Sequence, residues 1–186
     1  RHYPQLRDPV SAERQALFNR GNDIGLRARD LFPGGIDATN GLSKRFEDAP
    51  ERTRELMADQ SVNVIYEAAF RHEGILIFVD ILERNGTSWN AYEVKSSLRV
   101  SHVHFNDAAL QYYVLHESGI PVSGFSLVHI NGQYIREGAI QLNRLFQIVN
   151  VTAHCEKQLT EIAGRIVEMK NVLAGQQIPE QPIGEH

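Results

Sequence analysis

The segment from Ile75 to Ser97 constrains the fold more than any other part of the chain. It holds two strand-like runs, ILIFVDIL and SWNAYEV, separated by the polar residues 83–87. The polar stretch contains Asn85-Gly86, and an Asn-Gly pair between such runs is the strongest short signal of a β-hairpin. The sequence therefore predicts two antiparallel strands, and the turn brings Asp80 of the first strand beside Glu93 of the second.

Glu93 and Lys95 point the same way and Val94 the opposite way, because side chains on a strand alternate between its two faces. With Asp80 folded back, two carboxylates share one small volume. Hard divalent cations such as Mg²⁺ and Mn²⁺ suit this arrangement because they take oxygen ligands and retain water. A bound cation can activate water and neutralise charge on a phosphoryl oxygen, and a lysine can stabilise the same charge. The pattern is therefore typical of metal-dependent cleavage of phosphodiesters.

A second interpretation of these residues is a solvated group of charges on a hairpin, because short motifs often occur by chance. The surroundings of Asp80 argue against it. The carboxylate interrupts an otherwise apolar run from Ile75 to Leu82. A carboxylate in such a place is costly unless it is paired or binds a metal. The context therefore favours a functional Asp80.

Length and composition predict a single globular domain over residues 1–174, since the 186 residues are 42% hydrophobic and 23% charged. A Pro- and Gly-rich stretch, residues 175–186, is expected to be an extended tail that leads into a further region. The chain begins at Arg1, and we expect it to be part of a longer protein. Its net charge of −4 gives no indication of a basic face that binds nucleic acid, although an enzyme can concentrate positive charge locally.

The cellular location is expected to be cytoplasmic, with no membrane partner. No apolar run is long enough to span a bilayer, and the first residues lack the features of a signal peptide. The single cysteine, Cys155, cannot form an internal disulfide, which agrees with a reducing compartment. On its helix Cys155 is expected to be a small buried hydrophobe.

Apolar periodicity along the chain predicts alternating helices and strands rather than repeats. Pro33-Gly34-Gly35 ends the first helix, and Asp48 is a candidate cap for the second. His102 and His104 fall in a loop, where they could contact phosphate but are more simply solvated; Trp89 and Phe125 are expected in the core. The predicted helices span residues 12–31, 50–59, 105–118 and 151–173, and the predicted strands span 62–70, the two arms of the hairpin and 122–130.

The order of these elements and three short motifs resemble the PD-(D/E)XK superfamily. The motifs are Phe78-Val79-Asp80, Glu93-Val94-Lys95 and the segment 107–113, whose Gln111 stands where RecB-like nucleases carry a Q-x-x-x-Y helix motif. The RecB-like group includes the CRISPR-associated RecB-like exonucleases. Segments such as YEVKSS and DAALQYYVL are also similar to a bacterial family of unknown function thought to contain a RecB-like core. The resemblance covers roughly residues 18–169.

This resemblance implies an α/β fold with a restriction-endonuclease-like core, in which helices flank a mixed central β-sheet. It also implies a divalent-metal-dependent deoxyribonuclease, exonuclease-like, that binds DNA and uses Mg²⁺ or Mn²⁺. Asp80 and Glu93 would be metal ligands, with the main-chain carbonyl of Val94 as a third. Lys95 would be the catalytic lysine, and Gln111 would approach the metal or the substrate from the following helix.

The chain departs from the RecB-like pattern at two positions. Gly25 stands where a metal-binding His is usual in the first helix, and Leu115 replaces the Tyr of the helix motif. Tyr112, next to Gln111, could take over part of the substrate-stacking role. Glu67 could join the acidic site in place of the His, and a plain surface glutamate is about equally compatible with its position. An iron–sulfur cluster would need cysteines from outside this segment.

A second functional class therefore stays open. A nuclease fold that has lost its catalytic activity could serve as a DNA-binding or assembly module, and the missing His and the negative net charge support that alternative. Binding of a divalent cation between Asp80 and Glu93 would distinguish the two classes.

Overall fold

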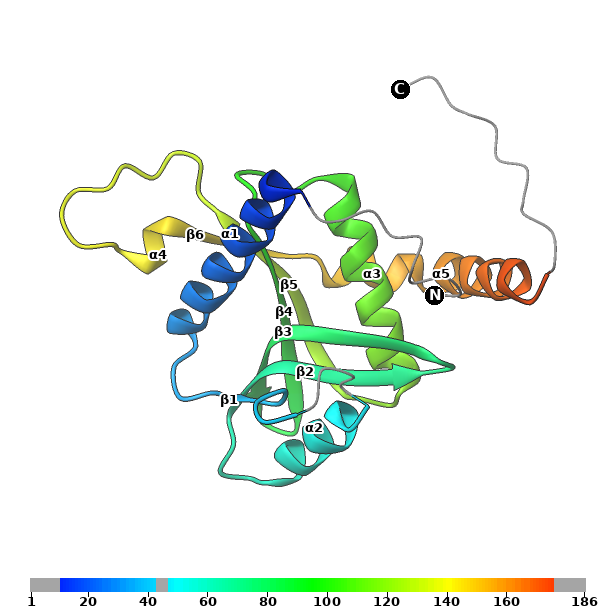
Figure 1. The fold of residues 1–186 in the computed structure, drawn as a ribbon. Helices are drawn as coiled ribbons and strands as arrows, with labels where there is room; N and C mark the ends of the chain where they lie inside the picture. The colour runs from blue at the N-terminus through cyan, green and yellow to red at the C-terminus, as the bar shows by residue number, and fades with distance from the viewer. Residues whose placement is uncertain (1–10, 43–46, 176–186) are drawn as a thin grey trace, which may run out of the picture.

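The computed structural model of the chain describes residues 11–42 and 47–175. These residues form an α/β fold in which helices flank one mixed six-stranded sheet (Figure 1). The strands lie in chain order in the sheet: β1 (Ile36–Asp37), β2 (Val64–His72), β3 (Ile75–Asn85), β4 (Ser88–Lys95), β5 (Val122–Ile130) and β6 (Phe146–Asn150). The helices are α1 (Ala12–Ala28), the 3₁₀ turn η2 (Arg29–Leu31), α2 (Ala49–Ala58), α3 (His102–Glu117), the short α4 (Leu142–Leu145) and α5 (Thr152–Ala174).

The centre of the sheet is the antiparallel meander of β2, β3 and β4. The predicted hairpin is confirmed: β3 and β4 pair antiparallel, and Gly86 closes their turn with a positive φ of 61°. Strand β5 pairs parallel to β4. Two parallel neighbouring strands need a crossover connection, and helix α3 provides it. Short β1 adds in parallel at one edge, and β6 adds antiparallel at the other.

The sheet splits at Asp80 and Glu93, and this split positions the candidate site. Strands β3 and β4 pair only from Ile81↔Tyr92 to the turn. Beyond that point β3 continues alongside β2 alone, whereas β4 continues alongside β5 as far as Lys95. In Figure 1 the two strand pairs run in clearly different directions from this point. Asp80 and Glu93 therefore lie at the base of a fork between the strands.

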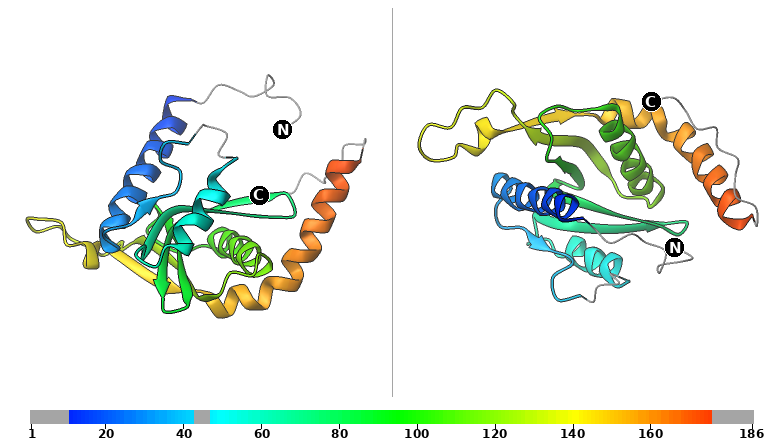
Figure 2. Two further views of the ribbon diagram at one scale, coloured as in Figure 1. Left: turned by 90° about the horizontal axis from the view of Figure 1, so that it is seen from below. Right: turned by 45° about the horizontal axis from the view of Figure 1, so that its top comes forward.

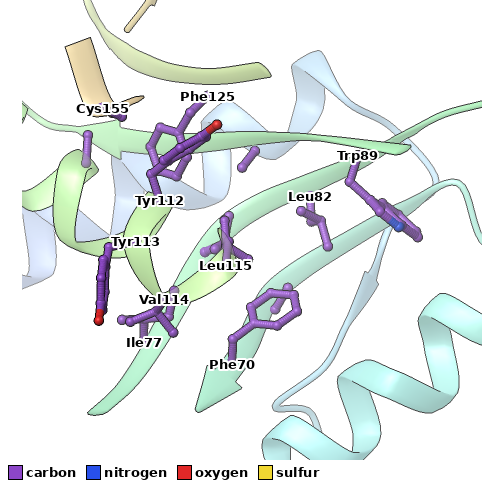
Figure 3. Packing of buried hydrophobic residues seen from close by; sticks show 14 of the residues in the cluster. Phe70, Ile77, Leu82, Trp89, Tyr112, Tyr113, Val114, Leu115, Phe125 and Cys155 are labelled. Atoms are coloured by element: carbon purple, nitrogen blue, oxygen red, sulfur yellow. The ribbon is translucent and has the colours of Figure 1, made fainter. Parts of the chain in front are cut away.

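Two hydrophobic clusters hold the layers together. The larger one joins α2, α3 and α5 to one face of the sheet, and the smaller one joins α1 and α4 to the other face. Trp89, Phe125 and Cys155 belong to the larger cluster, as the sequence predicted (Figure 3). Helix α2 is also fastened by a polar contact: the buried hydroxyl of Thr53 donates to the Ala49 carbonyl and accepts from the Ala69 N–H.

Helix α5 extends along one end of the molecule (Figure 2), and an ion pair between Lys170 and Glu73 joins its second half to the turn between β2 and β3. Its bounds agree closely with the predicted 151–173 helix. None of the helices in the described part of the chain combines the length and the apolar character needed to cross a lipid bilayer. Of the predicted tail, the residues after Gly175 lie outside the described residues.

Several predicted boundaries were wrong. Helix α3 begins at His102, so His102 and His104 lie in its first turn rather than in a loop. The cause is a capping box in which the Ser101 N–H donates to the His104 ring, a role that Glu or Gln usually fills. The first helix changes to a 3₁₀ turn over its last three residues, and Asp48 precedes α2 without a capping side-chain bond. Strands β1 and β6 and helix α4 were not predicted, because each is five residues or shorter.

Candidate active site

The Asp80 carboxylate closes the base of the fork. Its Oδ2 atom accepts a 2.6 Å hydrogen bond from the Val94 N–H. On that side of β4 the neighbouring strand has turned away, so the carboxylate takes the place of a strand partner for the backbone N–H. This bond explains why an acidic residue is tolerated inside the apolar run of β3, and it holds the carboxylate beside Glu93.

The Glu93 carboxylate is buried under α3 with both oxygens hydrogen-bonded. Oε1 accepts from Lys95 Nζ at 2.8 Å, and Oε2 accepts from Gln111 Nε2 at 2.7 Å. The alternation of β4 places Glu93 and Lys95 on one face, and α3 brings Gln111 over that face, as predicted. Gln111 is only 6% exposed, and its Oε1 atom has no hydrogen-bond partner among the described residues.

Burial weakens the acidity of both carboxyl groups, and the charge of Asp80 weakens that of Glu93 further. Burial raises the pKa of Asp80, although the Val94 N–H and Lys95 oppose the change. Burial, and then the charge of Asp80, raise the pKa of Glu93 to about 8 even though Lys95 favours the ionised form. Two neighbouring carboxyl groups, one of which hinders ionisation of the other, share a proton readily and gain stability from a cation.

Lys95 is held between two carboxylates, Glu93 on its own strand and Asp107 on α3. Burial alone would lower the pKa of Lys95, but the two carboxylates outweigh it and the pKa is raised. We did not predict a site role for Asp107. A signal was available, since Asp107 and Gln111 are four residues apart and therefore lie on one face of the helix.

A second charged group lies on the other side of the fork, around Arg29. The guanidinium binds Asp37 Oδ2 at 2.8 Å and Glu67 Oε1 at 2.9 Å. Glu67 has a positive φ of 52° within β2, so that Tyr66 and Ala68 belong to different clusters on opposite faces of the sheet. Nothing in the sequence predicted the roles of Arg29 and Asp37, because they depend on this reversal.

A cleft of about 540 Å³ separates α1 from the fork. Glu67 and Asp80 line it together with Arg29, and burial and the Asp80 charge raise the pKa of Glu67. Of the two alternatives for Glu67, the structure favours the position near Asp80 over a plain surface one, and it pairs the carboxylate with an arginine. Gly21 and Gly25 form the facing wall, and a Cβ atom added to either would meet no atom within 4 Å. A side chain at position 25 would therefore have room to extend into the cleft that Asp80 also lines.

Tyr112 is not brought to the fork. Its ring is 6% exposed and packs edge-on against Phe125, with 6.3 Å between ring centroids (Figure 3). A one-residue step turns a helical side chain by about 100°, so the neighbour of Gln111 enters the core instead of the site. The predicted contact of Tyr112 with substrate therefore has no support in this arrangement.

The donor set at the fork consists of oxygen atoms, as Mg²⁺ and Mn²⁺ prefer. Asp80 and Glu93 supply the carboxylates, and the Val94 main chain adjoins both. Within residues 11–42 and 47–175, no three His, Cys, Asp or Glu side chains converge as a ready-made metal site. Comparisons of the sequence with protein-family models and with curated proteins gave no match.

Proposed function

We propose that the chain is a divalent-metal-dependent nuclease that hydrolyses phosphodiester bonds of DNA, with a restriction-endonuclease-like core of the RecB-like type. The observation that carries the proposal is the fork, where the half-buried carboxylate of Asp80 raises the pKa of the buried Glu93. Both carboxylates lie beside Lys95 and Gln111. The resemblance of these four residues to the motifs of RecB-like nucleases supports the same assignment.

The residues at the fork fit a hard divalent cation. Asp80 and Glu93 would hold Mg²⁺ or Mn²⁺, and the Val94 carbonyl would be a further oxygen ligand. Glu67 is a candidate additional ligand from the other side of the cleft, once released from Arg29. When bound, such a cation supplies an activated water and neutralises charge on the phosphoryl group. The unpaired buried oxygen of Gln111 also fits, because an amide oxygen can accept a hydrogen bond from a water without adding charge.

Lys95 and Gln111 have different tasks in this mechanism. The Lys95 ammonium is a compact cation held at the mouth of the fork, where it can bind a phosphoryl oxygen and stabilise the charge that develops there. The Gln111 amide orients Glu93 from α3, so the carboxylate cannot rotate freely. Asp107 positions Lys95 from the same helix face.

A catalytically inactive DNA-binding or assembly module is the second candidate. Two observations favour it: both oxygens of Glu93 already have partners, and Gly25 offers no ligand from α1. In such a module the fork would be a self-contained polar cluster that stabilises the sheet. Cation binding separates this candidate from the nuclease.

The test is to measure cation binding and cleavage on the same preparation. Titration calorimetry with Mn²⁺ and Mg²⁺ is compared for the parent and for Asp80→Asn, and labelled single- and double-stranded DNA is incubated with Mn²⁺ or with EDTA. A nuclease should bind the cation and cut DNA only without EDTA, and Asp80→Asn should lose both properties. If no cation binds and no DNA is cut, the nuclease proposal fails; retained DNA binding would then favour the inactive module.

A further inference from the structure

A groove of about 360 Å³ runs between α3 and α5 and begins at the fork. Lys95, the proposed catalytic lysine, and Asp107 lie on its wall. Val103 and Leu110 of α3 face Ile162, Ile166 and Met169 of α5 across it. The groove therefore joins the reacting end of the site to an apolar channel between two helices.

The apolar lining of the groove is open to solvent at its rim. Val103 is 72% exposed and Met169 is 63% exposed, whereas Ile162 and Ile166 are buried at its base. Isolated exposed hydrophobic residues need no explanation, but here they border one groove together. Water in such a groove is readily displaced by a flat apolar group.

Polar groups at the rim favour an anionic ligand with hydrogen-bond acceptors. The Nδ1 atom of His104 accepts from the Ser101 N–H, so in the neutral ring the hydrogen is on Nε2 and that nitrogen is a donor. Arg165 adds a guanidinium on the α5 side, where it is paired with Glu161 on the same exposed helix face and keeps further N–H donors for a ligand. Among the described residues the acidic side chain that lines the groove is Asp107, and its charge is offset by Lys95.

We propose that this groove binds the unpaired base of a DNA nucleotide whose phosphate lies at Lys95. The inference rests on the proposed nuclease function and adds a substrate class to it: single-stranded DNA or a frayed strand end. The apolar walls suit the faces of the base, the donors of His104 and Arg165 suit its acceptors and the adjoining phosphate, and the groove starts where the reacting phosphate would lie. A base inside a duplex is stacked and paired, so it cannot enter a groove of this kind without being extruded.

The proposal can be tested by DNA binding in EDTA, which prevents cleavage. Fluorescence anisotropy compares a labelled single strand with a blunt duplex for the parent chain and for Val103→Gln/Met169→Gln. Both substitutions are at exposed positions and keep the charge, so folding and long-range attraction are preserved. We expect the variant to bind the single strand about tenfold more weakly, the scale of one stacked base. Ile135→Gln, at a 74% exposed position outside the groove, is the matched control and should bind like the parent.

Photocrosslinking locates the base independently of affinity. Single strands with 5-iododeoxyuridine at either end are irradiated on the protein, and crosslinked peptides are identified by mass spectrometry. Crosslinks in residues 103–110 or 162–169 support the proposal. Crosslinks confined elsewhere overturn it, as do equal affinities of the groove variant and the parent, or equal losses for duplex and single strand.

Failure of the groove proposal is distinguishable from failure of the nuclease proposal. A parent that binds and cuts DNA but crosslinks elsewhere loses only the groove assignment. A parent that neither binds nor cuts DNA loses both. A concentration-dependent dimer that Val103→Gln/Met169→Gln abolishes would assign the groove to a second copy of the chain and overturn the base-binding proposal.

Discussion

Asp80→Asn is expected to stabilise the metal-free protein at pH 8 and to leave its stability nearly unchanged at pH 5. The substitution removes one of two neighbouring carboxylates, while the amide oxygen of Asn can still accept from the Val94 N–H. It therefore removes the repulsion between Asp80 and Glu93 but keeps the hydrogen bond between residue 80 and the Val94 N–H.

The sign follows from the pKa of Glu93. In the folded protein this pKa is raised from 4.5 to about 8, so folding favours the protonated carboxyl group. The stability that this group contributes is fully present below about pH 4.5 and is lost as the pH rises through 8. At about 1.4 kcal/mol per tenfold change in proton affinity, the whole effect is about 5 kcal/mol.

Asp80 accounts for a part of this loss, because burial is the larger cause of the raised pKa. We expect removal of the Asp80 charge to restore about 1–2 kcal/mol at pH 8. In a domain of this size that is a rise in Tm of roughly 2–8 °C. At pH 5, well below the raised pKa of Glu93, that carboxyl group holds its proton, so the repulsion is largely absent.

The assay is thermal unfolding followed by circular dichroism in EDTA at pH 5 and pH 8, repeated with Mn²⁺. The parent should gain stability from Mn²⁺ at pH 8, by about 2.7 kcal/mol at a concentration of 100 Kd, and Asp80→Asn should not. If Asp80→Asn lowers Tm equally at both pH values, the carboxylates do not repel each other and the reasoning about the fork is wrong.

Four further outcomes are expected. Lys95→Ala should abolish DNA cleavage yet keep the rise in Tm caused by Mn²⁺, because the ammonium is not a ligand; a cleavage assay beside a thermal scan tests both. Gln111→Ala should slow cleavage by about 10–100-fold, less than Asp80→Asn does, because it loosens Glu93 without deleting a ligand. Thr53→Val should cost about 1–3 kcal/mol in urea unfolding, since it leaves a buried backbone N–H without its acceptor, with no change in the response to Mn²⁺. Gly25→His should strengthen Mn²⁺ binding in calorimetry, with Gly25→Ala as control, because its side chain would enter the open cleft beside Asp80.

The parts of the fold that the sequence predicted are those that depend on local pattern. The hairpin from Ile75 to Lys95 followed from the Asn-Gly pair and from strand alternation. The approach of Gln111 to Glu93 followed from helical spacing combined with the resemblance to RecB-like motifs. Both depend on residues close in sequence or on a motif, so pattern alone was sufficient.

The parts that escaped prediction depend on contacts between distant segments. The reversal at Glu67 needs a left-handed backbone conformation that non-glycine residues seldom adopt, and its partner Arg29 is 38 residues away. The start of α3 depended on a His in the capping role of Glu or Gln, which standard patterns do not contain. The fork forms because β3 and β4 stop pairing with each other and continue beside β2 and β5. The apolar periodicity of a sequence does not show where strands change partners.

The two ion pairs of Lys95 indicate how this side chain would respond to the cation proposed for the fork. Lys95 offsets the charge of Glu93, and the cation proposed for Glu93 would have to displace that ammonium because two positive charges repel. Asp107 gives the displaced ammonium a second carboxylate on α3, so Lys95 need not leave the site. In the proposed nuclease, a lysine released from Glu93 but still paired with Asp107 would keep N–H donors for a phosphoryl oxygen. In the proposed nuclease, Asp107 would therefore link cation binding to the positioning of Lys95.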